Sequence, residues 1–275
     1  MGGEGGTGEG NMRKKKVASK VLGAMSVLTL VFLWAPVLLI IVFSFSTNKY
    51  GIAWDEFTFK WYLKLFHNDA VRDALIRSLI IAGVTVIVST FIGTITAYGL
   101  YKLNFKGKQF LRTSILLPLV FPSIVTGSAL LVFFTRFIHI PLGYPSIIIA
   151  HIVFCSPLAV FIILGRMQRF DWSWEEAAMD LGATRLRTFI RVTGPQLMPG
   201  IMASAMLIFP WSFDDFVITY FVAGVGSTTL PIYVFSQLRF GSTPVINTIG
   251  TLFVAVTMAG MLLMFVLQKK TKTGG

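Results

Sequence analysis

Long apolar segments alternate with shorter polar connections along this chain of 275 residues. A helix that crosses a hydrocarbon layer about 30 Å thick needs about 20 apolar residues. Segments of this kind lie at about 21–45, 75–100, 113–135, 145–165, 199–222 and 246–268. The runs are continuous and do not alternate within stretches of about ten residues, so a β-barrel is not indicated. The pattern predicts an all-α polytopic membrane protein with six transmembrane helices.

Composition agrees with this interpretation. Hydrophobic residues make up 55% of the chain and charged residues 13%, about half of the roughly 25% that is usual in soluble domains. A net charge of +12 could indicate nucleic-acid binding. The basic residues are concentrated in the connections between apolar segments, however, so no nucleic-acid partner is expected. The single cysteine, Cys155, lies inside an apolar run, so no disulfide framework is expected.

The basic residues also predict the orientation. Most of them lie near the two termini and in alternate connections, and the positive-inside rule places that side in the cytoplasm, giving an N-in, C-in topology. The expected organisation is a flexible basic N-terminal tail (1–20), a first transmembrane helix (21–45), an extracytoplasmic connection (46–74), a transmembrane domain (75–268) that includes a cytoplasmic loop (166–198), and a cytoplasmic tail (269–275).

Aromatic residues and prolines add local detail. The spacings Trp61/Leu65 and Tyr62/Phe66 favour a short amphipathic helix at the membrane interface within 46–74, and an aromatic belt that only anchors the protein is an equal alternative. Prolines in the third and fourth apolar segments predict kinked or broken helices; they are Pro118, Pro122, Pro141, Pro145 and Pro157.

The connection 166–198 concentrates charge between two apolar segments. A helix is expected to begin at about 172, with Asp171 or Ser173 as its cap and acidic residues in its first turn, and to end at Gly182. A second helix at about 184–193 is expected to end at Gly194-Pro195. An ordinary amphipathic loop that returns the chain to the membrane would also fit this pattern.

The spacing within this loop resembles the signature of type I ABC importer permeases, Glu-Ala-Ala-x3-Gly-x9-Ile-x-Leu-Pro. The matching residues are Glu176, Ala177, Ala178, Gly182 and Pro195. Val192 replaces the isoleucine and Gly194 the leucine of that signature. The resemblance implies that this loop, Asp180 included, docks on a separate ATPase.

Further segments resemble the permease subunits of spermidine/putrescine importers, and they are 60–62, 180–184, 212–216, 228–231 and 244–247. The resemblance implies a pore-forming subunit in the bacterial inner membrane that moves polyamines inward by alternating access. It also implies a second homologous permease subunit, an ATPase dimer that binds ATP and Mg²⁺, and an extracytoplasmic polyamine-binding protein. This chain itself would hold no cofactor.

Asp214 and Asp215 are the only carboxylates inside a predicted span. A charge near the bilayer centre costs about 2.5–3.5 kcal/mol on insertion scales, so these residues are expected to face a cavity or a cation. With Trp211, Phe213 and Thr219 they form the predicted substrate pathway, because ammonium groups bind carboxylates and aromatic faces. The alternative is structural, in which Asp214 caps amides freed by a kink or the pair binds a neighbouring subunit.

Other chemistry is not indicated. His139 and His151 lack metal-ligand spacing, and the only Gly-Lys pair, at 107–108, lacks a Walker A pattern. We therefore expect a transport subunit that is not an enzyme. Alternatives are the same architecture with ferric iron, thiamine or an aminophosphonate as cargo, and an ATP-independent secondary transporter, for which we see no inverted repeat.

Overall fold

The computed structural model describes the backbone of residues 6–49, 53–239 and 244–273, and the side chains of 18–49, 53–239 and 244–259. Throughout these ranges the regular structure is helical, apart from one isolated antiparallel bridge between Ser46 and Phe57. The chain divides into two compact units, residues 1–68 with 237–275 and residues 69–236. The predicted all-α fold is confirmed for the described part of the chain.

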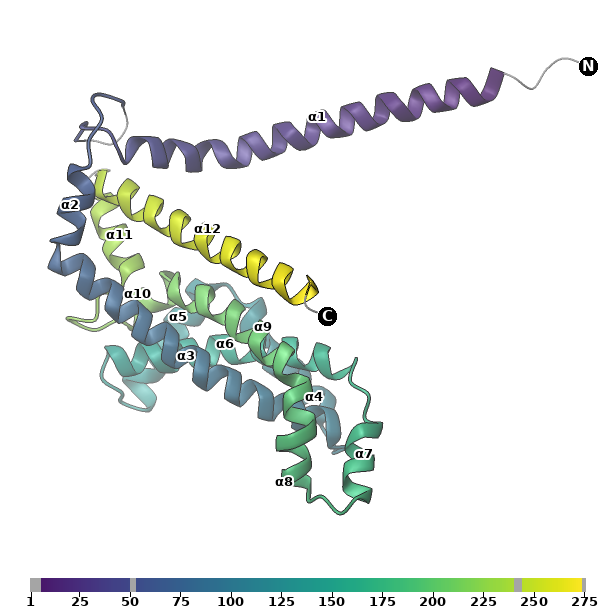
Figure 1. Cartoon of the computed structure of the whole chain (residues 1–275). Coiled ribbons are helices and arrows are strands. Elements are labelled where there is room, and N and C mark those ends of the chain that lie inside the picture. Colours follow the sequence, from purple (N-terminus) through teal and green to yellow (C-terminus); the bar gives the residue numbers. More distant parts are fainter. Residues whose placement is uncertain (1–5, 50–52, 240–243, 274–275) are drawn as a thin grey trace, which may run out of the picture. The chain divides into compact units, whose positions relative to one another are not determined.

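The helices carry the labels of Figure 1. In chain order they are α1 (Gly6–Phe43), α2 (Lys60–Phe66), α3 (Asp69–Lys102), α4 (Lys108–Val120), α5 (Ser123–Val132), the π-helical η1 (Phe133–Phe137), α6 (Tyr144–Met167), α7 (Ser173–Asp180), α8 (Arg185–Thr188), the π-helical η2 (Phe189–Thr193), α9 (Gly194–Phe213), α10 (Val217–Val222), α11 (Leu230–Arg239) and α12 (Pro244–Thr273).

Four helices in the described residues are long and apolar enough to cross a membrane. They are Ala18–Phe43, Asp69–Lys102, Tyr144–Met167 and Arg185–Phe213. A fifth span results if the pair Lys108–Val120 and Ser123–Phe137, bent by 105°, is taken as one. The described apolar part of α12, Pro244–Ala259, is shorter. The structure thus supports four to five candidate spans, against six expected.

Proline explains the bend in the third predicted segment. Phe121 precedes Pro122 and has extended backbone angles (φ −72°, ψ 140°), because a proline ring disfavours the helical conformation of the residue before it. The prediction of a broken helix is confirmed here. Pro157, in contrast, lies within the uninterrupted helix α6.

The first unit contains α1, α2 and α12. Trp61 and Leu65 of α2 are buried, and the indole Nε1 of Trp61 donates a hydrogen bond of 2.7 Å to the carbonyl oxygen of Ser46. A short helix therefore lies where the aromatic spacing predicted one, and its place at a membrane interface stays a prediction. Helix α1 begins at Gly6, inside the range assigned to the N-terminal tail.

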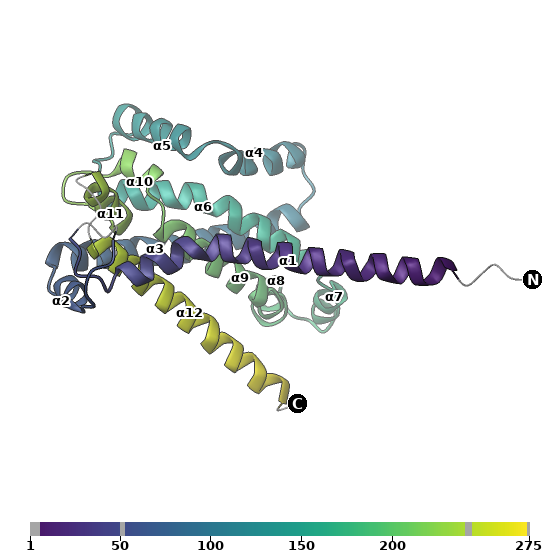
Figure 2. The ribbon, with the colours of Figure 1, turned by 90° about the horizontal axis from the view of Figure 1, so that it is seen from above.

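The second unit is built on α3, α6 and α9, which pack side by side (Figure 1). Figure 2 shows α4 and α5 along one side of α6 and α9 along the other. A Cβ atom on Gly93 of α3 would lie 2.3 Å from Cβ of Ala159 on α6, so glycine is what permits this close approach. The core of the unit includes Cys155, which is 1% exposed.

Candidate functional site

The first helix of the 166–198 loop starts as the sequence predicts. Helix α7 begins at Ser173, and the carboxylate of Asp171 accepts a hydrogen bond of 3.1 Å from the backbone N–H of Ser173. Of the two predicted caps, Asp171 makes the contact. Glu175 and Glu176 lie in the first turn, where the positive end of the helix dipole stabilises negative charge.

Gly182 ends α7 through its backbone conformation. Its φ is +83°, in the left-handed region that glycine adopts without strain. The N–H of Ala183 donates to the carbonyl of Ala178 at 3.1 Å, and the N–H of Gly182 donates to Met179 at 2.9 Å, the hydrogen-bond pattern of a Schellman motif. The prediction that Gly182 terminates this helix is confirmed.

The second helix of the loop does not end at Gly194-Pro195, and that prediction is wrong. α8, η2 and α9 follow one another without a break from Arg185 to Phe213. Pro195 stands in the first turn of α9, and the N–H of Gly194 bonds to the carbonyl of Phe189, five residues earlier. A π-helical turn directly before Pro195 therefore carries the helix past the proline without a break.

The predicted docking residues lie mostly on the surface. Glu176, Ala177, Asp180, Gly182 and Pro195 are exposed and Ala178 is half-buried. Nearby, the side chains of Leu181 and Leu186 are 90% and 70% exposed. Apolar side chains this exposed, next to charged ones, suit a surface that another protein covers. In Figure 1 the α7–α8 hairpin projects beyond the end of α9. Docking of an ATPase here stays a prediction.

The acidic pair lies in a break between two helices. α9 ends at Phe213 and α10 begins at Val217, so the expectation of one continuous helix over 199–222 is wrong. The hydrogen bonds of Asp215 and Thr219 explain the break. The backbone N–H of Thr219 bonds to the side-chain Oδ2 of Asp215 at 2.8 Å and not to its carbonyl, and the carbonyl of Asp215 accepts from the Thr219 hydroxyl at 3.0 Å. An aspartate side chain that competes for backbone donors interrupts a helix in this way.

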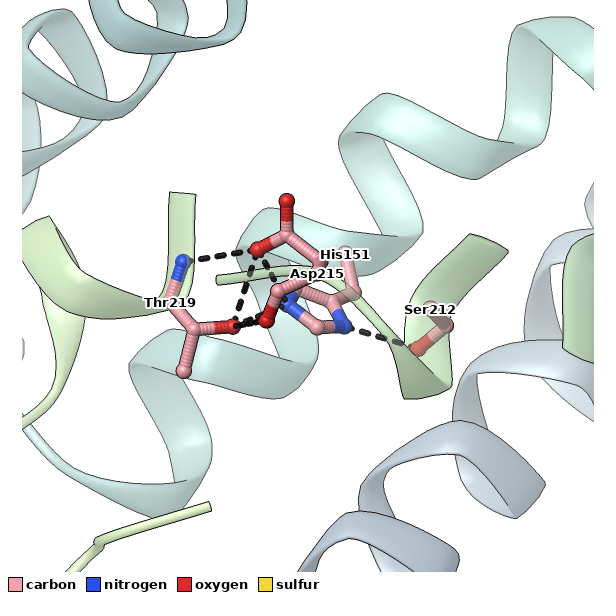
Figure 3. Close-up of polar contacts among 4 residues, drawn as sticks. All are labelled: His151, Ser212, Asp215 and Thr219. Carbon is pink, nitrogen blue, oxygen red and sulfur yellow. Dashed lines mark hydrogen bonds and ion pairs between the residues drawn. The ribbon is translucent and has the colours of Figure 1, made fainter. Parts of the chain in front are cut away.

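His151 connects the two sides of this break (Figure 3). Its Nδ1 lies 2.7 Å from the hydroxyl of Ser212, and its Nε2 lies 2.9 Å from the hydroxyl of Thr219. The same Nε2 is 3.4 Å from Oδ2 of Asp215. All these contacts are buried or partly buried, so the four residues form a polar network, here called the His151 network, between α6 and the α9–α10 break.

The predicted pathway residues therefore divide into two groups. Asp215 and Thr219 belong to the His151 network. Asp214 is exposed, and among the described side chains its carboxylate has no hydrogen bond or ion pair. Trp211 is 48% exposed, with its ring 5.8 Å from that of Phe154. Phe213 is half-buried and stacks on Phe209 at 5.7 Å. The structural alternative predicts Asp214 as the residue that caps backbone amides. In the structure Asp215 makes such a contact, with the backbone N–H of Thr219.

Sequence reasoning missed two residues. The sequence predicts no role for His151, because no metal-ligand partner stands near it in sequence and its contacts lie 61 and 68 residues away. The available signal was a histidine inside an apolar segment, which needs polar partners from another segment. Glu175 is predicted only as one of two acidic residues in the first turn of its helix, yet it is only 3% exposed. Within the described side chains, no group of three His, Cys, Asp or Glu residues could hold a metal ion.

Long apolar helices joined by short polar connections define the class of this chain as a polytopic membrane protein. The model of one family, described as "Binding-protein-dependent transport system inner membrane component", matches residues 89–272. This chain belongs to that family. It is a multi-pass component of the bacterial inner membrane and a transport subunit, not an enzyme.

Several curated proteins are similar over most of their length. The "Putrescine transport system permease protein PotI" of Escherichia coli (strain K12) is 38% identical over 249 residues, which are 88% of each chain. The "Spermidine/putrescine transport system permease protein PotC" of the same strain is 34% identical over 244 residues, 89% of this chain and 92% of PotC. PotC of Haemophilus influenzae (strain ATCC 51907 / DSM 11121 / KW20 / Rd) is 33% identical over 239 residues, 87% of this chain and 93% of its own.

Solved structures support the fold. A chain from the crystal structure of a bacterial ABC transporter involved in the import of the acidic polysaccharide alginate matches with a TM-score of 0.70 at 16% identity, over 94% of this chain and 97% of that one. A chain from the crystal structure of an amino acid ABC transporter with histidines matches with a TM-score of 0.54 at 18% identity, over 74% of this chain and 96% of that one. This chain therefore has the fold of an ABC importer permease.

Proposed function

We propose that this chain is a pore-forming permease subunit of an ATP-driven importer that moves spermidine or putrescine into the cytoplasm. The observation that carries the proposal is the 38% identity, over 88% of both chains, to a putrescine permease. Alternating access between the two sides of the membrane is the mechanism, and the chain holds no cofactor of its own.

The proposed topology has six transmembrane helices with both termini in the cytoplasm. The bent pair α4–α5 with η1 forms the third span, and α12 forms the sixth. The accumulation of Lys and Arg near the termini and in the 166–198 loop supports this orientation through the positive-inside rule. The loop then faces the cytoplasm, where an ATPase can reach it.

The proposed partners are a second homologous permease, a dimer of ATPase subunits that bind ATP and Mg²⁺, and an extracytoplasmic polyamine-binding protein. The family description, which names a binding-protein-dependent transport system, supports this set. The exposed face of Glu176, Ala177 and Asp180 with Leu181 supports docking at the loop. Closure of the ATPase pair would displace the loop and rearrange the spans around a central cavity.

The proposed contact with cargo is Asp214, flanked by Trp211 and Phe213. Asp214 is exposed, in contrast to Asp215, whose carboxylate is already occupied by Thr219 and His151. A free carboxylate gives an ammonium group a charge-assisted hydrogen bond, and an indole face within about 6 Å adds about 0.5–2 kcal/mol. This chemistry favours an organic cation over an anion such as an aminophosphonate.

Uptake of radiolabelled putrescine and spermidine by the complete complex in proteoliposomes tests the proposal. Uptake of at least one of them is expected to require ATP inside and to resist competition by thiamine or ferric iron. ATP-dependent uptake of a different substrate, with no uptake of either polyamine, would overturn the assignment of polyamines as the cargo. Uptake by this chain alone without ATP would make it a secondary transporter.

A further inference from the structure

Glu175 is the one acidic side chain of α7 that points inward. It is 3% exposed, whereas the adjacent Glu176 is exposed. Successive residues of an α-helix are rotated by about 100°, so two neighbouring carboxylates can face opposite sides. A carboxylate buried in this way needs hydrogen-bonding or charged partners. Its partners therefore show what α7 is attached to.

Three side chains bind the Glu175 carboxylate. The hydroxyl of Tyr98 donates to Oε1 at 2.8 Å, and the hydroxyl of Thr193 donates to the same oxygen at 3.3 Å. The ammonium of Lys102 forms an ion pair with Oε2. Tyr98 and Lys102 belong to the last turns of α3, and Thr193 ends η2 just before α9. The carboxylate therefore joins α7 to two other elements at once.

Trp172 strengthens the same attachment. Its ring stacks on Tyr101 with 4.7 Å between ring centres, and its Nε1 donates to the Tyr101 hydroxyl at 2.9 Å. The ammonium of Lys102 lies 3.9 Å from the centre of the Trp172 ring, within the range of a cation–π interaction. Lys102 thus binds both ends of the Trp172–Glu175 turn, and Tyr101 lies beside it on α3.

We propose that Glu175 is the positioning residue that fastens α7 to the C-terminal end of α3, so that a displacement of α7 moves α3 and η2 with it. This rests on the proposed function, in which an ATPase pushes on the outer face of α7. The two adjacent carboxylates then have separate tasks. Glu176 meets the partner protein, and Glu175 passes the movement into the membrane-spanning helices.

The attachment can be tested on the full chain in membranes without any cargo. Trypsin cleaves after Arg185 and Arg187, which are exposed in the loop. Glu175→Gln is expected to increase the cleavage rate in this loop at least fivefold, because it removes the charge that Lys102 binds. Glu176→Gln, the same change one residue further on, is the matched control and should cleave like the wild type. Equal rates in the two variants would overturn the proposal.

The transmission can be tested on the complete complex, by measuring polyamine taken up per ATP hydrolysed. Glu175→Gln and Lys102→Met are expected to leave ATP hydrolysis within about twofold of wild type and to lower uptake per ATP at least tenfold. The double exchange Lys102→Glu with Glu175→Lys should restore part of that loss, which a general loss of stability would not do. Lys106→Met, which removes an exposed charge beyond α3, is the control.

Wild-type uptake per ATP in Glu175→Gln would overturn the proposal. A wild-type complex that hydrolyses ATP but carries no polyamine would overturn the cargo assignment alone, and the trypsin comparison would still decide the role of Glu175. If Glu175→Gln does not accumulate in membranes, Tyr98→Phe serves instead. It removes one donor to Glu175 and keeps the ring that packs on Phe189 at 5.0 Å, and unchanged cleavage in that variant also counts against the proposal.

Discussion

The Nε2 atom of His151 lies 3.4 Å from Oδ2 of Asp215, and the side chains are only 3% and 9% exposed. This contact joins α6 to the break between α9 and α10. Because the remaining ring nitrogen binds Ser212 at the end of α9, one imidazole holds the two sides of the break together. It follows that Asp215 is bound within the protein, while Asp214 beside it remains accessible.

Replacement of His151 by alanine is expected to destabilise the protein. The change removes the His151 partner of the buried Ser212 hydroxyl and one of the partners of the Asp215 carboxylate, and an unsatisfied buried polar group costs about 1–3 kcal/mol. Thermal unfolding in detergent should show a lower melting temperature. His139→Asn is the control, because His139 is exposed at φ +51° and asparagine tolerates this conformation. An equal melting temperature in both variants would contradict the prediction.

Separate substitutions of the two aspartates should have different effects. Asp214→Asn is expected to leave the melting temperature unchanged and to lower uptake efficiency about 10- to 100-fold, since a hydrogen bond to a charged group contributes about 1.5–3 kcal/mol. Asp215→Asn is expected to lower the melting temperature. Uptake kinetics and thermal unfolding of both variants provide the check, and normal uptake by Asp214→Asn would remove this residue from the pathway.

Gly93→Ala should weaken the packing of α3 on α6. The added Cβ would lie 2.3 Å from that of Ala159, so the helices must separate, and overpacking of this kind costs about 1–3 kcal/mol. Gly99→Ala is the matched control on the same helix, because nothing lies within 4 Å of a Cβ placed there. The two variants are to be compared by thermal unfolding, and Gly93→Ala should melt at the lower temperature.

Glu176→Lys and Ala178→Trp are expected to release the ATPase subunits while the permease stays folded. Glu176 is exposed and Ala178 half-buried, so the first change reverses a surface charge and the second adds bulk to the docking face. Loss of a favourable charge at a helix start costs only about 0.3–1 kcal/mol. Co-purification with a tagged ATPase measures the effect, with Glu56→Lys outside the loop as the control. Undiminished co-purification in both loop variants would contradict docking at α7.

Gly182→Ala should disturb the loop through the backbone alone. No atom lies within 4 Å of a Cβ at this position, but φ is +83°, and a left-handed conformation costs other residues about 1–2 kcal/mol. Binding of the ATPase subunits should weaken, and Gly182→Asn should weaken it less, as asparagine adopts this conformation more readily. Gly165→Ala in α6, where a Cβ also meets nothing, should bind like the wild type.

Local signals in the sequence predicted local structure well. Gly182 was expected to end a helix because left-handed caps favour glycine, and its backbone has that conformation. Pro122 marked the bend between α4 and α5 for an equally local reason. Trp61 and Leu65, four residues apart, lie on one buried side of a short helix. In each case the cause lies within a few residues of the effect.

Features that depend on distant residues could not be predicted in the same way. The segment 199–222 is apolar apart from a few residues that include Asp214 and Asp215, and its sequence does not show that Asp215 is held by His151 of another helix. Glu175 and Glu176 are adjacent in sequence, and Glu175 is distinguished by its contacts with Tyr98, Lys102 and Thr193, of which Tyr98 is 77 residues away. Pro195 looked like a helix end, and the π-turn before it shows why it is not. Tertiary contacts decided the role of Glu175 and the burial of Asp215, whereas the path past Pro195 depends on a local change from α- to π-helical hydrogen bonding.

The burial of the chain's single cysteine has a practical consequence for measuring motion. Cys155 is 1% exposed inside α6, so a water-soluble maleimide has little access to it in the folded protein. A cysteine introduced at Leu181, whose side chain is 90% exposed, would therefore be labelled selectively without prior removal of native thiols. A spectroscopic probe attached there would report directly on the position of the α7–α8 hairpin during the transport cycle.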